Sequence, residues 1–262
     1  MRFDTITVAI DPRGVARLTL NRPEKRNAMS AQMIAELTAA AGQLGADVTV
    51  RVVVLAAEGD SFCAGGDLAW MRDQMEADAA TRADGARKLA MMLAALNNLP
   101  KPLIGRVQGQ AYGGGVGLMS VCDVAIGVLG ARFGLTETRL GLIPATIGPY
   151  VVARMGEAMA RRVFFSARLF DADEAVRLGL LAHVVAPDDL ETAVEAEVMP
   201  YLACAPGAVA EAKALIRMLS PMPDTAQIEA SITALVTRWE SDETAEGIAA
   251  FFAKTKPGWV RQ

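Results

Sequence analysis

The sequence predicts a layered α/β fold with a helical C-terminal region. Up to residue 187, short apolar runs typical of strands alternate with helical patterns. Two glycine-rich bends each follow an apolar strand directly, and after Pro187 the chain reads as consecutive helices. We therefore expect a core over residues 1–187 that carries the functional site and a helical region over residues 188–262. These observations also allow a doubly wound sheet, but no G-x-G-x-x-G motif follows a strand, which disfavours dinucleotide binding.

Composition narrows the class of protein. The chain has 262 residues, of which 52% are hydrophobic, and a formal net charge of -4, so it can bury a large core and offers no basic surface for nucleic acid. Without a signal-peptide pattern or the roughly 18 uncharged apolar residues that a membrane helix needs, we expect a cytoplasmic protein. Three distant cysteines disfavour disulfides, and one histidine leaves little material for a metal site, so we expect no metal or redox cofactor.

The first strands and helix follow from simple patterns. Residues 5–10 and 15–20 alternate as strands around a turn at 11–14. After a polar loop, Ser30 can cap a helix with one apolar face, formed by Met33, Ile34, Leu37, Ala41 and Leu44. Residues 50–56 form a β-branched run typical of a strand covered on both faces.

The first glycine-rich bend, residues 58–68, follows that strand with the sequence EGDSFCAGGDL. Residues 70–85 are acidic and weakly periodic, and we expect them to form a mobile, lid-like segment. Residues 86–99 predict a helix that ends before Pro100.

The chain is organised around residues 103–117, LIGRVQGQAYGGGVG, which predict a buried strand, a bend and a helix start. Short apolar runs, a turn-rich stretch at 136–149, two helices and a last strand at 181–185 follow. Four helices are then expected at 188–202, 206–219, 224–240 and 241–254. Pro206 suits a first helical position, and Asp224 with Gln227 resembles a capping box.

The two bends share a chemical property. Glycine tolerates positive φ and lets a ligand approach the main chain, while the first NH groups of a helix have no internal partner. Such a bend can accept developing negative charge. If folding brings the two bends together, they provide two donors for one oxyanion.

Several segments, in one order along almost the whole chain, resemble the enoyl-CoA hydratase/isomerase family, or crotonase superfamily. They are NRPEKRNAM, SFCAGGDL, VQGQAYGGGVGL, CDVAI, FGLTETRLGLIPATIGP, LGLLAHVV and FFAKTKPGW. Within the family, DLAWM, Gly117 and IPATIGPYVV most resemble bacterial methylglutaconyl-CoA hydratases and their relatives in branched isoprenoid acid degradation, a resemblance that implies a role in leucine degradation.

The resemblance implies a spiral of ββα units, a helical C-terminal region used for trimer contacts, and a homotrimer or dimer of trimers. It implies that the NH groups of Gly66 and Gly114 hold the thioester carbonyl oxygen. It also implies coenzyme A, as part of the substrate, beside residues at CoA-binding positions: Lys25, Arg26, Ala28, Ala64, Asp67, Leu68 and Lys254. A position just after a bend also suits Asp67 as a structural cap.

Glu137 matches one of the two glutamates of the typical hydratase, while the other position is Gly117. Because glycine cannot transfer a proton, three hypotheses remain. In the first, which we favour, Glu137 alone serves hydration, as the resemblance to methylglutaconyl-type relatives implies. In the second, Glu137 moves a proton between C2 and C4, which makes the protein a Δ3,Δ2-enoyl-CoA isomerase. In the third, the protein binds acyl-CoA with little turnover.

Other candidates are weaker. His183 in an apolar strand is expected to be a satisfied core group, and no third group orients it toward Cys63 as a thiol nucleophile would need. Ser61 does not lie in a G-x-S-x-G elbow. Trp70, Met71 and Tyr112 are candidates for the acyl pocket, although such residues are commonly core.

Overall fold

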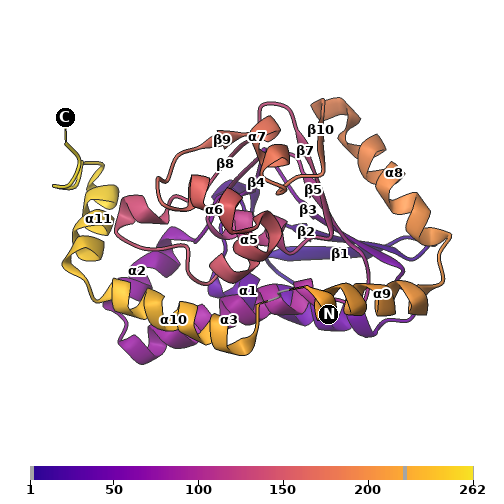
Figure 1. The fold of residues 1–262 in the computed structure, drawn as a ribbon, viewed down its shortest axis with the longest axis horizontal. Helices are drawn as coiled ribbons and strands as arrows, with labels where there is room; N and C mark the ends of the chain where they lie inside the picture. Colours follow the sequence, from indigo (N-terminus) through magenta and orange to yellow (C-terminus); the bar gives the residue numbers. More distant parts are fainter. Residues whose placement is uncertain (1–2, 221–222, 262) are drawn as a thin grey trace.

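The computed structural model describes residues 3–220 and 223–261, which fold into two sheets surrounded by helices (Figure 1). Among these residues, the larger sheet has the strand order β1 (Ile6–Ile10), β2 (Val15–Leu20), β3 (Val52–Ala57), β5 (Leu103–Val107), β7 (Val124–Val128) and β10 (His183–Val185). The smaller sheet has the order β4 (Ser61–Cys63), β6 (Gln110–Tyr112), β8 (Arg132–Gly134) and β9 (Phe170–Asp171).

The chain passes repeatedly from a strand of the larger sheet to a strand of the smaller one. Strands β1 and β2 form an antiparallel hairpin, and the other neighbours in the larger sheet are parallel. In the smaller sheet β4, β6 and β8 are parallel and β9 is antiparallel to β8. The chain passes from β3 to β4, from β5 to β6 and from β7 to β8, and each pair is followed by helical structure. This is the predicted α/β spiral of ββα units.

The helices occupy the remaining segments of the described chain. They are α1 (Ala31–Ala46), α2 (Leu68–Glu76), α3 (Ala79–Asn97), α4 (Gly114–Ser120), α5 (Gly148–Met155), α6 (Glu157–Phe164), α7 (Ala172–Arg177), α8 (Leu190–Leu202), α9 (Pro206–Leu219), α10 (Thr225–Trp239) and α11 (Asp242–Ala253). Short 3-10 turns are η1 (Pro23–Lys25), η2 (Glu137–Leu140) and η3 (Pro187–Asp189). The described residues include no helix with the length and apolar character needed to cross a membrane.

Local signals predicted several boundaries correctly. The Ser30 hydroxyl accepts a hydrogen bond from the Met33 NH at 3.2 Å and caps α1. Asp224 and Gln227 form a capping box at the start of α10. All residues of β3 are buried, as expected for a parallel strand covered on both faces.

Residues 70–85, expected to form a mobile, lid-like segment, lie mostly in helices α2 and α3, which their weak apolar period did not reveal. The Asp67 carboxylate accepts a hydrogen bond from the Ala69 NH at 2.8 Å and starts α2, while Asp78 accepts one from the Thr81 NH at 2.8 Å and starts α3. Each of the two helices therefore begins at an aspartate cap. The acidic residues between the caps weaken the apolar period by which a helix is usually recognised in a sequence.

The C-terminal helices pack around the core from several sides. Figure 1 shows α8 at one end of the molecule, α11 at the other, and α10 lying along α3, which it contacts. Helix α11 packs on η2, and a small apolar cluster of Leu142, Trp239 and Ile248 joins this region to α10. The division of the chain at residue 187 stays a prediction.

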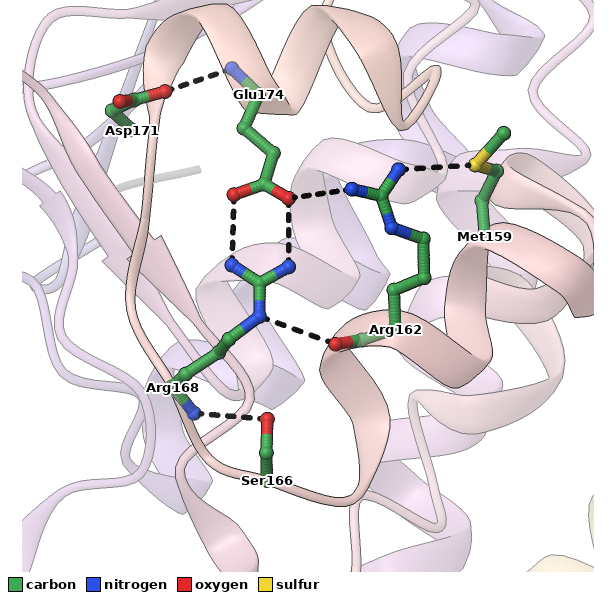
Figure 2. A network of polar contacts seen from close by, with 6 residues as sticks. All are labelled: Met159, Arg162, Ser166, Arg168, Asp171 and Glu174. Carbon is green, nitrogen blue, oxygen red and sulfur yellow. Dashed lines mark hydrogen bonds and ion pairs between the residues drawn. The ribbon is translucent and has the colours of Figure 1, made fainter.

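A polar network lies beside β9, which pairs antiparallel with β8 (Figure 2). The Arg168 guanidinium donates two hydrogen bonds to the Glu174 carboxylate, both at 2.7 Å, and Arg162 donates a third at 3.3 Å. Asp171 caps α7 by accepting from the Glu174 NH at 2.8 Å. The network ties α6, α7 and the loop before β9 together, beside the strand that leads to Glu137.

Replacing Glu174 with glutamine should lower the free energy of unfolding by about 1–3 kcal/mol, because it removes the charge that the bidentate pair stabilises. The hydrogen bonds from Arg168 lower the pKa of Glu174. Its stabilising contribution is therefore present above the unfolded-state pKa and is lost as pH falls through the lower folded-state pKa. Urea unfolding at pH 7 and pH 3 measures both effects.

Glu157→Gln is the matched control, because the Glu157–Arg161 pair is exposed and should contribute under about 0.5 kcal/mol. Equal midpoints for the two variants at pH 7 would contradict a stabilising role for the network.

Candidate active site

Folding brings the two glycine-rich bends side by side. Strands β4 and β6 pair in parallel, with Cys63 opposite Ala111, and each strand runs directly into its bend. A Cβ added to Gly65 would lie 3.2 Å from the Tyr112 carbonyl oxygen, and one added to Gly115 would lie 3.0 Å from the Cys63 Cβ. The bends are thus in direct contact at one end of the smaller sheet.

Glycine is required at these bends by conformation and by space. Gly65 has φ of 95° and Gly113 has φ of 48°, a region that other residues rarely adopt. A Cβ at Gly114 would overlap the Met29 side chain. Met29 also pairs with the first bend, donating its NH to the Gly65 carbonyl oxygen at 2.8 Å, and therefore connects the two bends.

The NH groups of Gly66 and Gly114 donate a hydrogen bond to no described residue. Both residues are partly exposed, whereas Gly65, Gly113 and Gly115 are buried. Gly114 is the first residue of α4, where an NH has no partner within the helix. Two accessible main-chain donors therefore lie on adjoining bends, an arrangement that can hold one oxyanion.

The Glu137 carboxyl group packs against the second bend. Residue Glu137 begins η2, just after β8, and β8 is held to the bend by a hydrogen bond from the Gly113 NH to the Gly134 carbonyl oxygen at 2.9 Å. Glu137 Oε1 lies 2.9 Å from the position that a Cβ on Gly113 would take. The carboxyl group is therefore next to the residue that precedes Gly114.

Burial changes the acidity of this group. Glu137 Oε2 is buried and has no hydrogen-bond partner among the described residues. Desolvation of the charged form raises the pKa of Glu137 to about 7. A carboxyl group with this pKa can accept and release a proton near neutral pH.

The position of the second family glutamate is filled by apolar side chains. Gly117 is buried in α4, and a Cβ there would lie 2.6 Å from Ile147 Cγ2 and 3.5 Å from Leu93 Cδ1. A carboxylate at this position would require Ile147 to move. The site thus offers the Glu137 carboxyl group beside the bends and hydrocarbon where the typical hydratase has its second glutamate.

The loop predicted to meet coenzyme A lies against the first bend. The Ala64 NH donates to the Arg26 carbonyl oxygen at 3.0 Å, which holds the loop beside the bend. Lys25 and Arg26 are exposed there, and Ala28 is buried. Leu68 is exposed at the start of α2, so these predicted residues are close together.

The other two predicted CoA-binding residues, Asp67 and Lys254, differ from this group. Asp67 is 7% exposed, caps α2 and forms an ion pair with Arg22 at 2.9 Å, which is a structural role. Lys254 lies at the end of α11, exposed, and its side chain forms no ion pair within the described chain.

The sequence reasoning missed Asn27, which fastens the same loop. Its side chain is buried, donates to the carbonyl oxygens of Glu58 and Ser61 at 2.8 and 2.9 Å, and accepts from the Arg22 NH at 2.9 Å. Asn27 has φ of 53°, a conformation that asparagine tolerates better than most residues. The only sign of this role in the sequence was the position of an asparagine in a polar loop before a helix.

Other candidates have clear positions. His183 is exposed on β10, so the expectation of a satisfied core histidine is wrong; an edge strand at the surface explains the difference. Burial raises the pKa of the Cys63 thiol to about 12, which disfavours a nucleophilic thiolate. In the part of the chain that is described, no cluster of His, Cys, Asp or Glu is suited to hold a metal ion.

The aromatic candidates border the bends. Trp70 and Tyr112 are partly buried, and the Tyr112 hydroxyl donates to the Gln110 side chain at 3.0 Å. The Trp70 indole lies 3.6 Å from the position of a Cβ on Gly66, and Met71 lies 3.8 Å from it. Trp70 and Met71 therefore border the first bend.

Fold and site together define a crotonase-type α/β protein with paired main-chain donors. Comparisons with known proteins give the same class. The crystal structure of an enoyl-CoA hydratase from Shewanella pealeana ATCC 700345 has a TM-score of 0.81 and 34% identity, covering 98% of this chain and 97% of that one. Pseudomonas aeruginosa AtuE has a TM-score of 0.80 and 38% identity, covering 98% of this chain and all of that one (100%).

Comparison of sequences identifies the protein family. Enoyl-CoA hydratase ACTT6 of Alternaria alternata is 34% identical over 205 residues, which are 78% of this chain and 67% of that protein. The family model for enoyl-CoA hydratase/isomerase matches residues 11–262. The chain belongs to the enoyl-CoA hydratase/isomerase family.

Proposed function

We propose that the protein hydrates 2-enoyl-CoA thioesters, with Gly66 and Gly114 as the oxyanion hole and Glu137 as the proton-transferring residue. The observation that carries this proposal is the buried Glu137 carboxyl group packed against Gly113, beside two main-chain NH groups that donate to no described residue. Relatives named as enoyl-CoA hydratases support the reaction class.

The proposed reaction uses these groups in two steps. Glu137 takes a proton from water as the water oxygen bonds to C3, and the electron pair of the double bond moves toward the thioester oxygen. The NH groups of Gly66 and Gly114 stabilise that charge, each contributing about 3 kcal/mol. Glu137 then returns the proton to C2 as the enolate collapses, giving the 3-hydroxyacyl thioester without any further cofactor.

The CoA part of the substrate is proposed to lie along the loop of Lys25, Arg26 and Ala28, with Ala64 and Leu68 on the facing segment. The exposed cations of this loop and its hydrogen bond to the first bend support this placement. Lys254 is proposed to reach a CoA phosphate, while Asp67 acts through the loop by holding Arg22.

A branched substrate of the 3-methylglutaconyl type is the finer proposal. It rests on the resemblance of DLAWM, Gly117 and IPATIGPYVV to hydratases of that class and on the apolar filling of the Gly117 position. The second candidate is a Δ3,Δ2-enoyl-CoA isomerase. The presence of Glu137 alone, with Gly117 at the position of the second family glutamate, favours it, because moving one proton from C4 to C2 needs one base.

One assay separates the candidates. The purified protein is supplied with a 2-enoyl-CoA and, separately, with a 3-enoyl-CoA, and the products are identified by mass and by chromatography. Hydration predicts a product heavier by one water from the first substrate. A shifted double bond without added water would favour the isomerase, and tight binding of both without turnover would favour the acyl-CoA-binding alternative.

The pH dependence of hydration should reflect Glu137. Because burial raises the pKa of Glu137 to about 7, and the base must be ionised to accept a proton from water, kcat/KM should fall as pH drops below about 7. Rates measured from pH 5 to pH 9 in buffers of constant ionic strength test this. An acid limb at the ordinary glutamate pKa of 4.5 would contradict the buried-base assignment.

We also propose that the protein assembles into a homotrimer or a dimer of trimers. The family resemblance suggests this assembly, and the exposed apolar surface of α9 supports it. Helix α9 has no buried residue and exposes Leu215, Ile216, Met218 and Leu219. Pairing this surface with a second copy would remove the apolar area from water. A cytoplasmic location stays a prediction from the sequence.

The variant carrying Ile216→Glu and Leu219→Glu should shift the mass measured by light scattering from an oligomer to a monomer. A charge on an exposed helix face leaves the fold of one chain intact but is costly in an apolar interface. A wild-type protein that is monomeric at micromolar concentration would contradict the assembly.

A further inference from the structure

The direction of the Glu137 carboxyl group depends on its main chain. Its Oε2 atom is buried and has no hydrogen-bond partner among the described residues, and the carboxyl group accepts a hydrogen bond from its own main-chain NH. No described side chain therefore holds this group from outside. Its place beside Gly113 follows from where the turn η2 places the main chain of Glu137.

One peptide unit, which joins Gly141 to Leu142, holds that turn. The Leu142 NH donates to the Glu137 carbonyl oxygen at 3.2 Å. The Gly141 carbonyl oxygen of the same unit accepts three hydrogen bonds from the C-terminal helices: from Arg238 Nε at 2.9 Å, from Arg238 Nη2 at 2.7 Å and from the Thr244 hydroxyl at 2.9 Å. Because a peptide unit is planar and its C=O and NH point in opposite directions, donors on the Gly141 oxygen direct the Leu142 NH toward Glu137.

Close packing leaves this peptide unit little room to rotate. Gly141 has φ of 74°, and a Cβ there would lie 2.6 Å from the Glu243 carbonyl oxygen. A Cβ on Gly247 would lie 2.6 Å from the Leu140 carbonyl carbon, so α11 lies directly against η2. Thr244 is 1% exposed, and its hydroxyl group is therefore shielded from competing water.

We infer that Arg238 and Thr244 are positioning residues, which hold the peptide unit between Gly141 and Leu142 and thereby keep the Glu137 carboxyl group beside the two glycine-rich bends. The inference rests on the proposed function for the role of Glu137 in turnover. It makes the C-terminal helices α10 and α11 part of the geometry of the site. Both residues act through the main chain of η2, so their loss should affect turnover more than binding.

The variant that combines Arg238→Met with Thr244→Val tests this inference. It removes all three donors, while valine keeps the size of threonine and methionine keeps an apolar stem. We expect kcat for a 2-enoyl-CoA to fall by about 10–100-fold, the effect of displacing a catalytic group by about 1 Å. KM should stay within a few-fold, because the proposed CoA-binding loop is unchanged. Circular dichroism and thermal unfolding establish that the variant is folded.

Single variants separate positioning from general stability. Thr244→Val should lower kcat, and Thr244→Ser, which keeps the hydroxyl group, should restore it. Arg87→Met is the matched control, because it removes an exposed ion pair with Glu229 that also attaches α10 to the core but lies on α3. It should leave kcat unchanged. If the double variant does not fold, equal kcat values for Thr244→Val and Thr244→Ser would overturn the inference.

Titration of Glu137 separates the inference from the reaction. Carbon-13 NMR of glutamate-labelled protein, with Glu137→Gln to assign the signal, should show the pKa of about 7 to which burial raises Glu137. The double variant should lower that pKa, because a displaced carboxyl group is better solvated. If no enoyl-CoA is hydrated but this pKa falls in the variant, hydration is wrong and the positioning role stands. If hydration proceeds and the folded double variant changes neither kcat nor this pKa, the positioning role is wrong.

Discussion

Replacing Glu137 with glutamine is expected to lower kcat for a 2-enoyl-CoA by about 10²–10⁴-fold, the usual contribution of a positioned general acid–base group. Glutamine keeps the shape that packs against Gly113 but cannot take a proton from water. Affinity for a saturated acyl-CoA should stay within a few-fold, because the two main-chain donors and the loop of Lys25 are unchanged. Stopped assays of turnover and calorimetric binding measure the two quantities separately.

The same variant should be more stable than the wild type above pH 7. Since burial raises the folded-state pKa of Glu137 to about 7, the stability associated with its protonated form is present below the unfolded-state value of 4.5 and is lost as pH rises to 7. Glutamine removes this loss, so the variant should gain up to about 3 kcal/mol at pH 8 and little at pH 4.

Glu157→Gln is the control for both measurements, since Glu157 is exposed on α6. Full turnover in Glu137→Gln would remove Glu137 from the mechanism. An equal gain in stability at pH 4 and pH 8 would contradict the expectation that ionisation of the Glu137 carboxyl group destabilises the folded protein.

Replacing Gly66 with proline should lower kcat by about 10²–10³-fold, the effect of removing one oxyanion-hole donor. Proline has no NH, and at Gly66 that NH is proposed to hold the thioester oxygen. Gly66→Ala is the matched control because a Cβ there meets Trp70 at an ordinary 3.6 Å and the NH remains. Alanine should therefore retain activity within about ten-fold, well above the proline variant.

Circular dichroism and thermal unfolding establish whether both Gly66 variants keep the fold. The comparison is informative only between folded proteins, so the ratio of their kcat values is taken after that measurement. Equal activity in folded Gly66→Pro and Gly66→Ala would contradict an oxyanion role for this NH.

Local signals were sufficient for much of the fold. Ser30 and Asp224 marked helix starts because a cap is a short-range interaction, and the buried residues of β3 followed from a β-branched run. The helices over residues 70–85 were not predicted, although Asp67 and Asp78 are caps of the same kind, and the mobility expected of this segment stays a prediction. The acidic composition between them outweighed the cap signal.

Features that depend on distant contacts were not visible in the sequence. The apolar environment of Gly117 comes from Ile147, on a later segment, and from Leu93 on α3. The exposure of His183 depends on β10 being at the edge of its sheet. The adjacency of the two bends followed from family resemblance, while the burial of Glu137 Oε2 required the packed structure.

A crystal structure with bound butyryl-CoA would measure the distances from the thioester oxygen to the main-chain nitrogens of Gly66 and Gly114, and so test the proposed oxyanion hole. We expect both distances to be about 2.7–3.1 Å, with the Glu137 carboxyl group facing C2 and C3 of the acyl chain. A thioester oxygen bound by water or by side chains, with either glycine NH out of hydrogen-bonding range, would contradict it.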